Sequence, residues 1–289
     1  MMKSKRYHKT HKPAGLGKLL NSIPTRTPVL YPLYLARQIY RQEHQFVLPG
    51  LPDAFDGFRA VFLSDLHFGA YLDEQRLKEI VKRVNAEDAD AVFLGGDYGD
   101  DPSSSLMMWS VTEDFRAKEG VYAVLGNHDI DGAETAEPLC DAMADRGVTV
   151  LVNDTAFILR NGERLAVSGL DECYFGSPDW EVIEKESSPA RAGIVLAHSP
   201  DVLPDYFKRV KEGESAFFGL FLCGHTHGGQ IALGGRAIRS SSLYGNRYNM
   251  GHYTEKGADI LVSPGLGTSF LPLRFGAKPA YHVITLKKK

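Results

Sequence analysis

Polar side chains of a restricted kind follow five short apolar runs of this chain. Aspartate, asparagine or histidine comes after each run with no more than two residues between. The side chains that could bind a metal are two carboxylates, one amide and four imidazoles: Asp65, His67, Asp97, Asn127, His198, His225 and His227. Nitrogen and oxygen ligands without a thiolate are typical of Mn, Fe, Zn or Co, and suit Ca or a structural Zn less well. The sequence therefore indicates a metal site assembled from distant segments.

Two of these motifs share one spacing, in which a single residue separates two polar side chains. Asp65 and His67 flank Leu66, and His225 and His227 repeat the arrangement. Where a strand ends, side chains two residues apart can face the same side, while Leu66 points back into the core. Glycines stand beside the motifs and should let the backbone turn sharply and approach the ions closely. They occupy positions 95, 96, 126 and 224.

Each motif also has an ordinary structural explanation when it is considered alone. Asp-Leu-His or Gly-Asn-His-Asp is more often a turn with capping residues, and a lone His198 is more often a hydrogen-bonded histidine than a ligand. The His225-Thr226-His227 motif is more specific. The conjunction favours a metal site, because the motifs occur together in one chain and each follows a strand pattern.

The elements that must position these residues can be predicted from hydrophobic patterns. Short, wholly apolar runs predict strands covered on both faces at residues 60–63, 91–94, 121–125, 194–197 and 220–223. Helical spacing predicts helices at residues 73–86, 103–118 and 136–146. Residues 148–152, 156–159 and 165–170 indicate a meander with a hairpin turn at Asn161-Gly162, and further strands are expected near 260–262 and 282–286.

Together these elements predict an α/β fold with four layers, α/β/β/α, in which mixed sheets lie inside and helices lie outside. Ligands of α/β sheets gather beyond the carboxyl ends of the strands. The five strand ends that carry the polar motifs are therefore expected to meet in one pocket.

Charge is distributed unevenly along the 289 residues, although the net charge is only −3. Nine lysines and arginines and no acidic residue precede Glu43, and the remainder carries −12, with 24 basic against 36 acidic residues. The chain thus divides into a basic N-terminal arm, residues 1–50, and a domain at residues 51–289.

The apolar stretch at residues 29–36 is far shorter than the roughly 20 residues of a membrane span, so we expect neither a span nor a standard secretion signal.

The basic arm allows three interpretations. It could be a solvated tail. It could bind an anionic membrane surface through residues 1–42, because leucine, valine and tyrosine side chains lie beside its charges. Nucleic-acid binding is the least favoured, and we expect none, since the body of the protein is acidic and contains no recognised module.

The three cysteines are widely spaced and odd in number. They are Cys140, Cys173 and Cys223. Without a paired spacing they predict buried free thiols in a reducing compartment, and they argue against a zinc or redox motif.

The order Asp65-x-His67, Gly-Gly-Asp97, Gly-Asn127-His128-Asp129, His198, Gly224-His225-x-His227 resembles the calcineurin-like metallophosphoesterases over roughly residues 58–230. Three later stretches resemble one bacterial, membrane-associated branch of that family, which includes a UDP-2,3-diacylglucosamine pyrophosphatase. They are Gly-His-Thr-His-Gly-Gly-Gln230, Val262-Ser-Pro-Gly-Leu-Gly-Thr-Ser and Pro272-Leu-Arg-Phe-Gly. The similarity covers nearly the whole chain except the basic arm.

This resemblance implies two divalent metal ions per chain, Mn or Fe in the first place and Zn or Co as alternatives. The ligands of one ion would be Asp65, His67 and His227. The ligands of the other would be Asn127, His198 and His225. Asp97 would bridge the two ions, which would activate a shared water for in-line attack on phosphorus without a covalent enzyme intermediate.

The resemblance also implies roles for residues beside the ligands. His128 would act near the leaving group as an acid or oxyanion stabiliser, with Asp129 orienting its imidazole. Arg274 could contact a substrate phosphate in a bidentate manner, although a structural ion pair explains it equally well. Gln230 could touch substrate or form a backbone hydrogen bond.

The function expected from these features is hydrolysis of a phosphodiester or pyrophosphate bond, on a lipid-linked substrate such as UDP-2,3-diacylglucosamine. The expected location is the bacterial cytoplasm, with a peripheral position on the inner face of the cytoplasmic membrane. One alternative is a soluble phosphomonoesterase or nucleotide phosphodiesterase. Another is an inactive scaffold, which the complete ligand set and His128 argue against.

Overall fold

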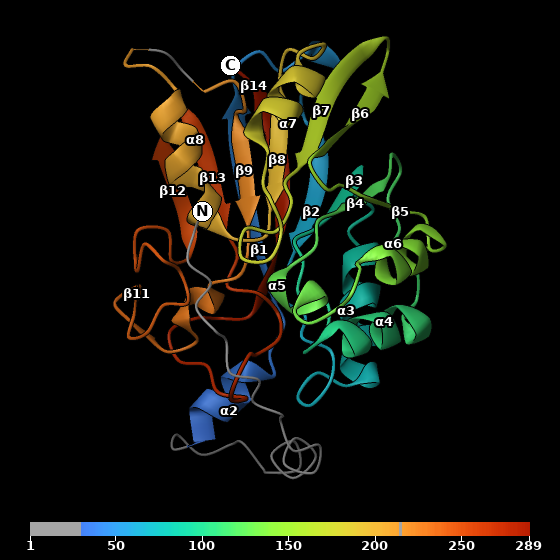
Figure 1. The fold of residues 1–289 in the computed structure, drawn as a ribbon, viewed down its shortest axis with the longest axis vertical. Helices are drawn as coiled ribbons and strands as arrows, with labels where there is room; N and C mark the ends of the chain where they lie inside the picture. Colours follow the sequence, from blue (N-terminus) through green and yellow to red (C-terminus); the bar gives the residue numbers. More distant parts are fainter. Residues whose placement is uncertain (1–29, 214–215) are drawn as a thin grey trace.

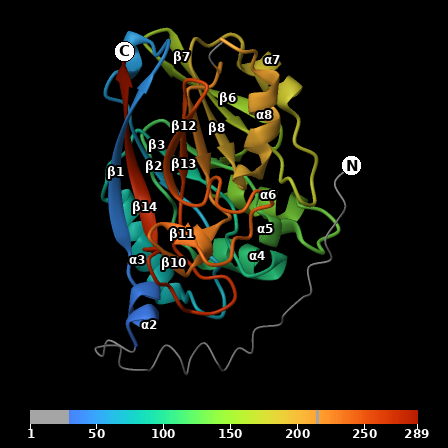
Figure 2. The same cartoon turned by 90° about the vertical axis from the view of Figure 1, so that its left-hand side faces the viewer.

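The computed structural model of this chain describes residues 30–213 and 216–289. Two six-stranded sheets pack face to face, and helices cover their outer faces (Figures 1 and 2). Parallel and antiparallel neighbours occur in both sheets. The four-layer α/β/β/α fold with mixed sheets is therefore confirmed.

The first sheet combines strands from both ends of the described chain. Its spatial order is β1, β14, β2, β3, β4 and β5. In that order the strands comprise Tyr40–Leu48, Ala280–Lys288, Arg59–Leu63, Ala91–Leu94, Val121–Ala123 and Val148–Val150. β14 and β2 run antiparallel, whereas β2, β3 and β4 are parallel neighbours. The carboxyl ends of β2, β3 and β4 therefore lie at one edge.

The second sheet has the order β12, β13, β9, β8, β7 and β6. These strands comprise Gly251–Glu255, Ala258–Val262, Leu220–Cys223, Gly193–Ala197, Glu163–Gly169 and Asp154–Arg160. β8 and β9 are parallel neighbours, so their carboxyl ends also meet. The β6–β7 hairpin turns at Asn161-Gly162, where both φ angles are positive as the predicted turn requires. A separate small hairpin joins β10 (Ala232–Leu233) and β11 (Arg236–Ala237).

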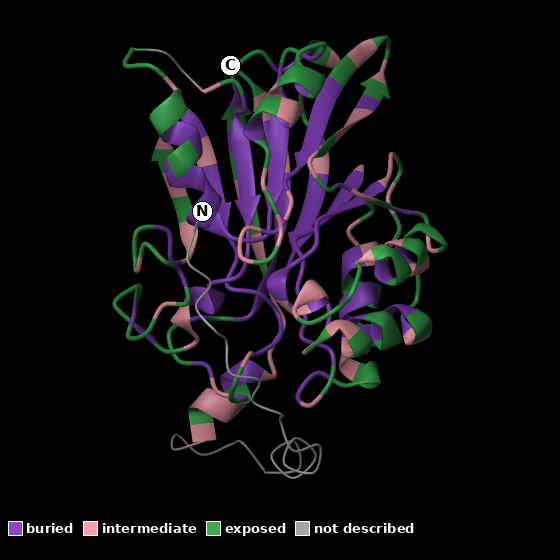
Figure 3. Cartoon of the chain, viewed as in Figure 1, coloured by how far each residue is buried: buried purple, intermediate pink, exposed green. Residues whose placement is uncertain are grey.

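Alternate residues of the central strands face different cores. In β2, Val61 and Leu63 pack with helices, whereas Ala60 and Phe62 pack against the second sheet. The helices that cover the outer face of the first sheet are α3, α4 and α6, at Glu74–Asn85, Pro102–Val111 and Glu137–Ala144. The helices that cover the outer face of the second sheet are α7 and α8, at Trp180–Ser187 and Leu203–Arg209. Figure 3 shows the central strands buried between these layers, which explains why their sequences are apolar throughout.

Helix α4 is shorter than the predicted segment 103–118. The side chain of Asp101 caps its start by accepting from the amide of Ser104. The helix ends at Val111, and Thr112 has extended backbone. The following segment returns to the first sheet, where the amide of Lys118 donates to a backbone carbonyl. Pairing with the sheet outweighs the local helical spacing there.

The structured domain begins earlier than the predicted boundary at residue 50. β1, drawn from the expected arm, pairs in parallel with β14 over its whole length. Its exposed side chains are Arg41, Glu43, Gln45 and Val47, while Phe46 and Leu48 are buried. Helix α2, Tyr31–Ala36, is held by a hydrogen bond from the amide of Arg274 to the carbonyl of Pro32. Residues 1–29 of the arm lie outside the described residues.

The predicted meander is only partly correct. β5 pairs in parallel with β4 in the first sheet, because α6 carries the chain back before that strand begins. Only the β6–β7 hairpin remains of the predicted arrangement.

All three cysteines are free; Cys223 is buried, and the other two are partly buried. Among the described residues, we find no helix with the length and apolar character needed to cross a membrane.

Candidate metal centre

The predicted ligands converge at the carboxyl ends of β2, β3, β4, β8 and β9, where the two sheets meet. They fall into two groups that share one residue. All seven side chains are buried. The predicted convergence of distant strand ends is therefore present in the folded chain.

The first group contains Asp65, His67, Asp97 and His227, whose ligand atoms lie within 4.8 Å of one another. The Nε2 atoms of His67 and His227 are 3.0 Å apart. Oδ1 of Asp65 lies 3.6 Å from Nε2 of His227. Oδ2 of Asp97 lies 3.5 Å from Nε2 of His67. Four donor atoms thus point into one small volume.

The second group contains Asp97, Asn127, His198 and His225. Oδ1 of Asn127 lies 2.9 Å from Nδ1 of His225 and 3.2 Å from Nε2 of His198. The two imidazole nitrogens are 3.3 Å apart. Oδ2 of Asp97 lies 3.3 Å from Nε2 of His198. The same Asp97 oxygen therefore reaches both groups.

The chemistry of this donor set fits divalent cations. Burial lowers the pKa of His225 to about 3, so its imidazole is neutral at pH 7 and keeps a free lone pair. The pKa of His227 is also lowered, first by burial and then by the charge of His67. Burial alone would lower the pKa of His198 too, but the charge of Asp97 raises it to about 10. A cation would displace the proton on His198 and take its place beside Asp97.

The backbone adopts a left-handed conformation at five of the predicted ligands. The φ angles of Asp65, His67, Asp97, His225 and His227 are 52°, 49°, 56°, 68° and 51°. Asp65 and His67 face the same group, as expected, and Leu66 packs in the core, but left-handed backbone replaces the alternation of an extended strand. A non-glycine residue in this region is strained, and such strain persists where surrounding contacts enforce it, often at functional sites.

Glycines allow the close approach that this arrangement needs, as the sequence predicted. A Cβ atom on Gly126 would lie 2.2 Å from Oδ1 of Asp97. One on Gly224 would lie 2.4 Å from Oδ2 of Asp65. Either substitution would push a carboxylate away from the cluster.

His128 lies at the edge of the first group. Its ring contacts that of His67 edge-on, with ring centroids 4.9 Å apart. Its Nδ1 atom lies 3.0 Å from the carbonyl oxygen of Asp100. Its amide donates to Oδ1 of Asp97, which leaves Oδ2 of that carboxylate for the cluster. The carbonyl of Asp100 therefore orients the imidazole.

Asp129 has a different role from the one predicted. Its carboxylate accepts from the amides of Asp97, Tyr98 and Gly126, at 2.8, 2.9 and 2.8 Å. It also accepts from the hydroxyl of Ser105 at 2.7 Å. Each carboxylate oxygen receives two of these four bonds. Asp129 therefore holds the backbone that carries Asp97, and the expected orientation of His128 by Asp129 is corrected.

This role predicts a loss of stability when Asp129 is replaced by asparagine. The amide NH₂ would face two N–H or O–H donors, and the free energy of unfolding should fall by about 2–5 kcal/mol. Urea unfolding of the metal-free protein measures the change. Asp131→Asn is the control, because its carboxylate accepts none of these bonds. Unchanged stability of Asp129→Asn, with only kcat reduced, would restore the imidazole-orienting role.

Arg274 does not reach the surface. Its guanidinium is fully buried and donates to the backbone carbonyls of Gly267 and Pro264, and one nitrogen lies 3.3 Å from Nδ1 of His227. Burial lowers the pKa of Arg274 to about 9. Among the described residues Arg274 forms no ion pair, and backbone carbonyls occupy donors of its guanidinium. Arg274 instead connects the loop after β13 to the Nδ1 side of the His227 imidazole.

Gln230 forms backbone hydrogen bonds, which is one of its two predicted roles. Its Oε1 atom accepts from the amide of Ser269 at 2.7 Å, and its Nε2 atom donates to the carbonyl of Leu271 at 3.5 Å. These backbone hydrogen bonds place the loop at residues 269–275 beside the segment that carries His227.

Sequence reasoning missed a group of residues that packs against His225. The ring of Tyr174 lies over that of His225, with centroids 5.0 Å apart. Its hydroxyl donates to Asp201 at 2.5 Å, and Ser242 donates to the other oxygen of the same carboxylate. Asp201 follows the ligand His198 by three residues, and this proximity is the signal that could have identified it.

A four-layer sandwich with a buried cluster of aspartate, asparagine and histidine at its strand ends defines a metallohydrolase. The calcineurin-like phosphoesterase family matches residues 58–229. The chain belongs to this family, as the motifs predicted, and it is a metal-dependent hydrolase.

Three of the relatives with curated names are similar to this chain over most of their length. The chain is 33% identical over 265 residues to "Uncharacterized metallophosphoesterase YkuE" of Bacillus subtilis, covering 89% of each chain. It is 27% identical to "Uncharacterized protein YpbG" of the same organism, covering 78% of this chain and 79% of the relative. It is also 27% identical to "Phosphodiesterase YaeI" of Escherichia coli, covering 79% and 82%. The names of the first and third relatives support the family, and the narrower pyrophosphatase branch stays a proposal.

Proposed function

We propose that this protein hydrolyses a phosphodiester or pyrophosphate bond with two divalent cations per chain, Mn or Fe first and Zn or Co as alternatives. The substrate we propose is lipid-linked, such as UDP-2,3-diacylglucosamine, at the inner face of a bacterial cytoplasmic membrane. The observation that carries the dinuclear proposal is the single Asp97 oxygen within 3.5 Å of histidine nitrogens of both groups.

Two cations held by these groups would lower the pKa of a water molecule and neutralise the charge of the phosphoryl oxygens. The chain itself fixes the donors before substrate arrives, because buried hydrogen bonds hold the backbone of Asp97 and the carboxylate of Asp65. Such preorganised charge is a large contribution to catalysis.

We propose that His128 donates a proton to the leaving group. A carbonyl only accepts, so the bond to Asp100 places a proton on Nδ1 of His128. Nε2 then carries a proton only in the imidazolium form. We infer that His128 acts as an acid from Nε2.

A comparison of three substrates tests the proposal. The rate of Mn-dependent hydrolysis should be highest for UDP-2,3-diacylglucosamine, intermediate for bis-p-nitrophenyl phosphate and lowest for p-nitrophenyl phosphate. Preference for the monoester would favour a soluble phosphomonoesterase. Absence of any metal-dependent hydrolysis would favour the scaffold alternative.

A further inference from the structure

Exposed apolar side chains gather at the end of the molecule that carries helix α2. Six of them form what we call the apolar rim: Tyr31, Tyr34, Ile231, Phe270, Leu271 and Phe275. Each is between 39% and 55% exposed. Single apolar residues on a surface are ordinary, whereas a contiguous group usually marks an interaction site.

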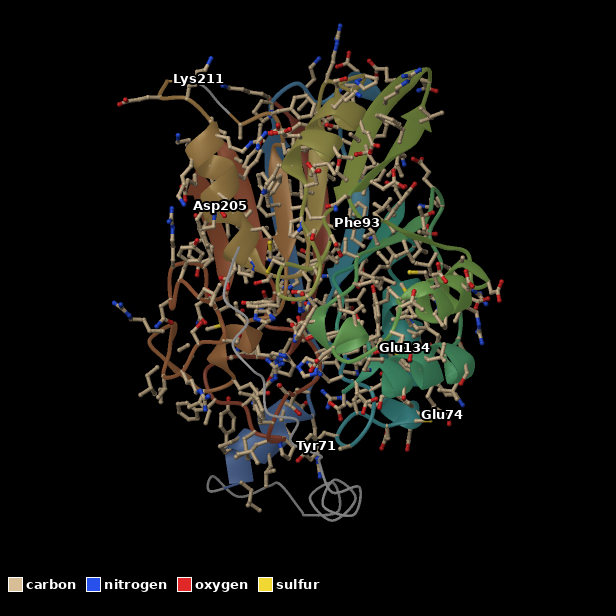
Figure 4. The ribbon with its side chains drawn as sticks, viewed as in Figure 1. Tyr71, Glu74, Phe93, Glu134, Asp205 and Lys211 are labelled. Atoms are coloured by element: carbon tan, nitrogen blue, oxygen red, sulfur yellow. The ribbon has the colours of Figure 1, made fainter. Side chains whose placement is uncertain are left out.

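Contacts between three segments make the rim one surface. The ring of Tyr31 packs edge-on against Phe275, with centroids 6.2 Å apart, and lies 6.4 Å from that of Tyr34. Ile231 forms a β-bridge with Phe275. The hydroxyl of Tyr71 donates to the carbonyl of Phe270 at 3.4 Å. Figure 4 labels Tyr71 toward the end of the molecule that carries α2, and Figure 2 shows α2 and the β10–β11 hairpin toward this same end.

The rim borders the metal centre. Gln230 lies three residues after His227 and holds the loop at 269–275 through both ends of its amide. Arg274 of that loop lies against the ring of His227. A surface that rests on the rim would therefore lie next to the cluster.

The sequence around the rim is basic, in contrast to the rest of the chain. Residues 230–254 contain three arginines and no acidic residue, of which Arg247 pairs with Glu255, and residues 260–289 also contain no acidic residue. Residues 1–29, which lead into α2, contain seven lysines and arginines and no acidic residue. Positive charge beside apolar and aromatic side chains complements an anionic lipid surface. A second copy of the same face would instead place like charges together.

We propose that the apolar rim docks on an anionic phospholipid bilayer and so presents the metal centre to the headgroup layer. Phe270 and Leu271, the most exposed pair, would enter the boundary between headgroups and acyl chains. Basic side chains beside them would contact the anionic headgroups. This inference rests on the proposed function for its biological purpose, but the docking itself requires no substrate.

Sedimentation of the full chain with vesicles tests the docking. The protein should sediment with vesicles of phosphatidylcholine mixed with phosphatidylglycerol, less with phosphatidylcholine alone, and less again at high salt. Leu271→Ser should reduce the partition coefficient about tenfold, whereas Leu159→Ser should leave it nearly unchanged. Leu159 is a matched control, because it is also exposed and belongs to β6, which lies away from α2 (Figure 1).

A second variant separates the rim from the arm. Replacing the seven lysines and arginines of residues 1–29 by glutamine should weaken binding to anionic vesicles further. If that variant loses binding while Leu271→Ser binds normally, the arm acts alone and the rim proposal fails. A dimer in solution that dissociates in Leu271→Ser, without vesicle binding, would assign the face to a second copy and also overturn it.

The outcome is independent of the lipid-linked substrate. Hydrolysis of bis-p-nitrophenyl phosphate without vesicles should be the same for Leu271→Ser and the unaltered protein. Vesicle binding without hydrolysis of UDP-2,3-diacylglucosamine would support the rim and remove that substrate. Hydrolysis of UDP-2,3-diacylglucosamine without any vesicle binding would support that substrate and overturn the rim proposal.

Discussion

Asp97→Ala should bind metal poorly in both halves of the site and lose about 10³-fold or more of kcat/KM. Oδ2 of Asp97 is the only carboxylate oxygen that the described residues place within 3.5 Å of histidine nitrogens in both groups. Its removal takes one ligand from each cation and one negative charge from a buried cluster of four histidines. Metal analysis of the purified protein, together with steady-state kinetics, measures both effects.

Two further variants make this result specific. Asp97→Asn keeps the shape of the side chain and removes its charge, so metal loss there identifies the charge as the cause. Asp145→Ala changes an exposed carboxylate far from the cluster and should change neither metal content nor rate. Full metal occupancy in Asp97→Ala would contradict the shared-ligand assignment.

His128→Ala should keep its metal content and lose about 10²–10⁴-fold of kcat, the range for loss of a general acid. The side chain of His128 belongs to neither ligand group, and its Nδ1 atom is engaged by the carbonyl of Asp100. Metal analysis and kcat, measured on the same preparation, separate this outcome from that of Asp97→Ala.

The leaving group distinguishes an acid from a merely structural residue. A phenyl phosphodiester has a poorer leaving group than bis-p-nitrophenyl phosphate and depends more on protonation. The rate loss in His128→Ala should therefore be larger for the phenyl ester. Equal losses for the two esters, or loss of metal, would show that His128 acts through the cluster.

The composition of the site was predictable because each ligand follows a strand end. The apolar runs before Asp65, Asp97 and His198 identify buried strands, and parallel strands end at one edge of a sheet. Three-dimensional proximity then follows from the fold class. What the runs do not encode is the left-handed backbone at Asp65 and Asp97, since other segments hold that backbone through hydrogen bonds.

Residues beside the ligands were harder to interpret. Asp129 is adjacent to His128 in sequence, which favoured a direct contact, yet its carboxylate turns toward the amides of Asp97 and Gly126. Arg274 has the sequence context of a phosphate ligand, but the loop after β13 encloses it. Direction and burial of a long side chain depend on tertiary packing, which local sequence does not contain.

The two edge strands of the first sheet, β1 and β5, were also difficult to predict, because their neighbours depend on tertiary packing. β1 alternates polar and charged residues because much of it is exposed, so its sequence resembles an arm. β5 has a typical strand sequence, but its neighbour depends on the path of α6 and not on its own residues.

Anomalous X-ray scattering from crystals of the Mn-loaded protein would show whether two ions share Asp97. We expect two manganese peaks at the ends of β2, β3, β4, β8 and β9, with the Asp97 carboxylate as a ligand of both. A single peak, or two peaks that do not share Asp97, would contradict this expectation.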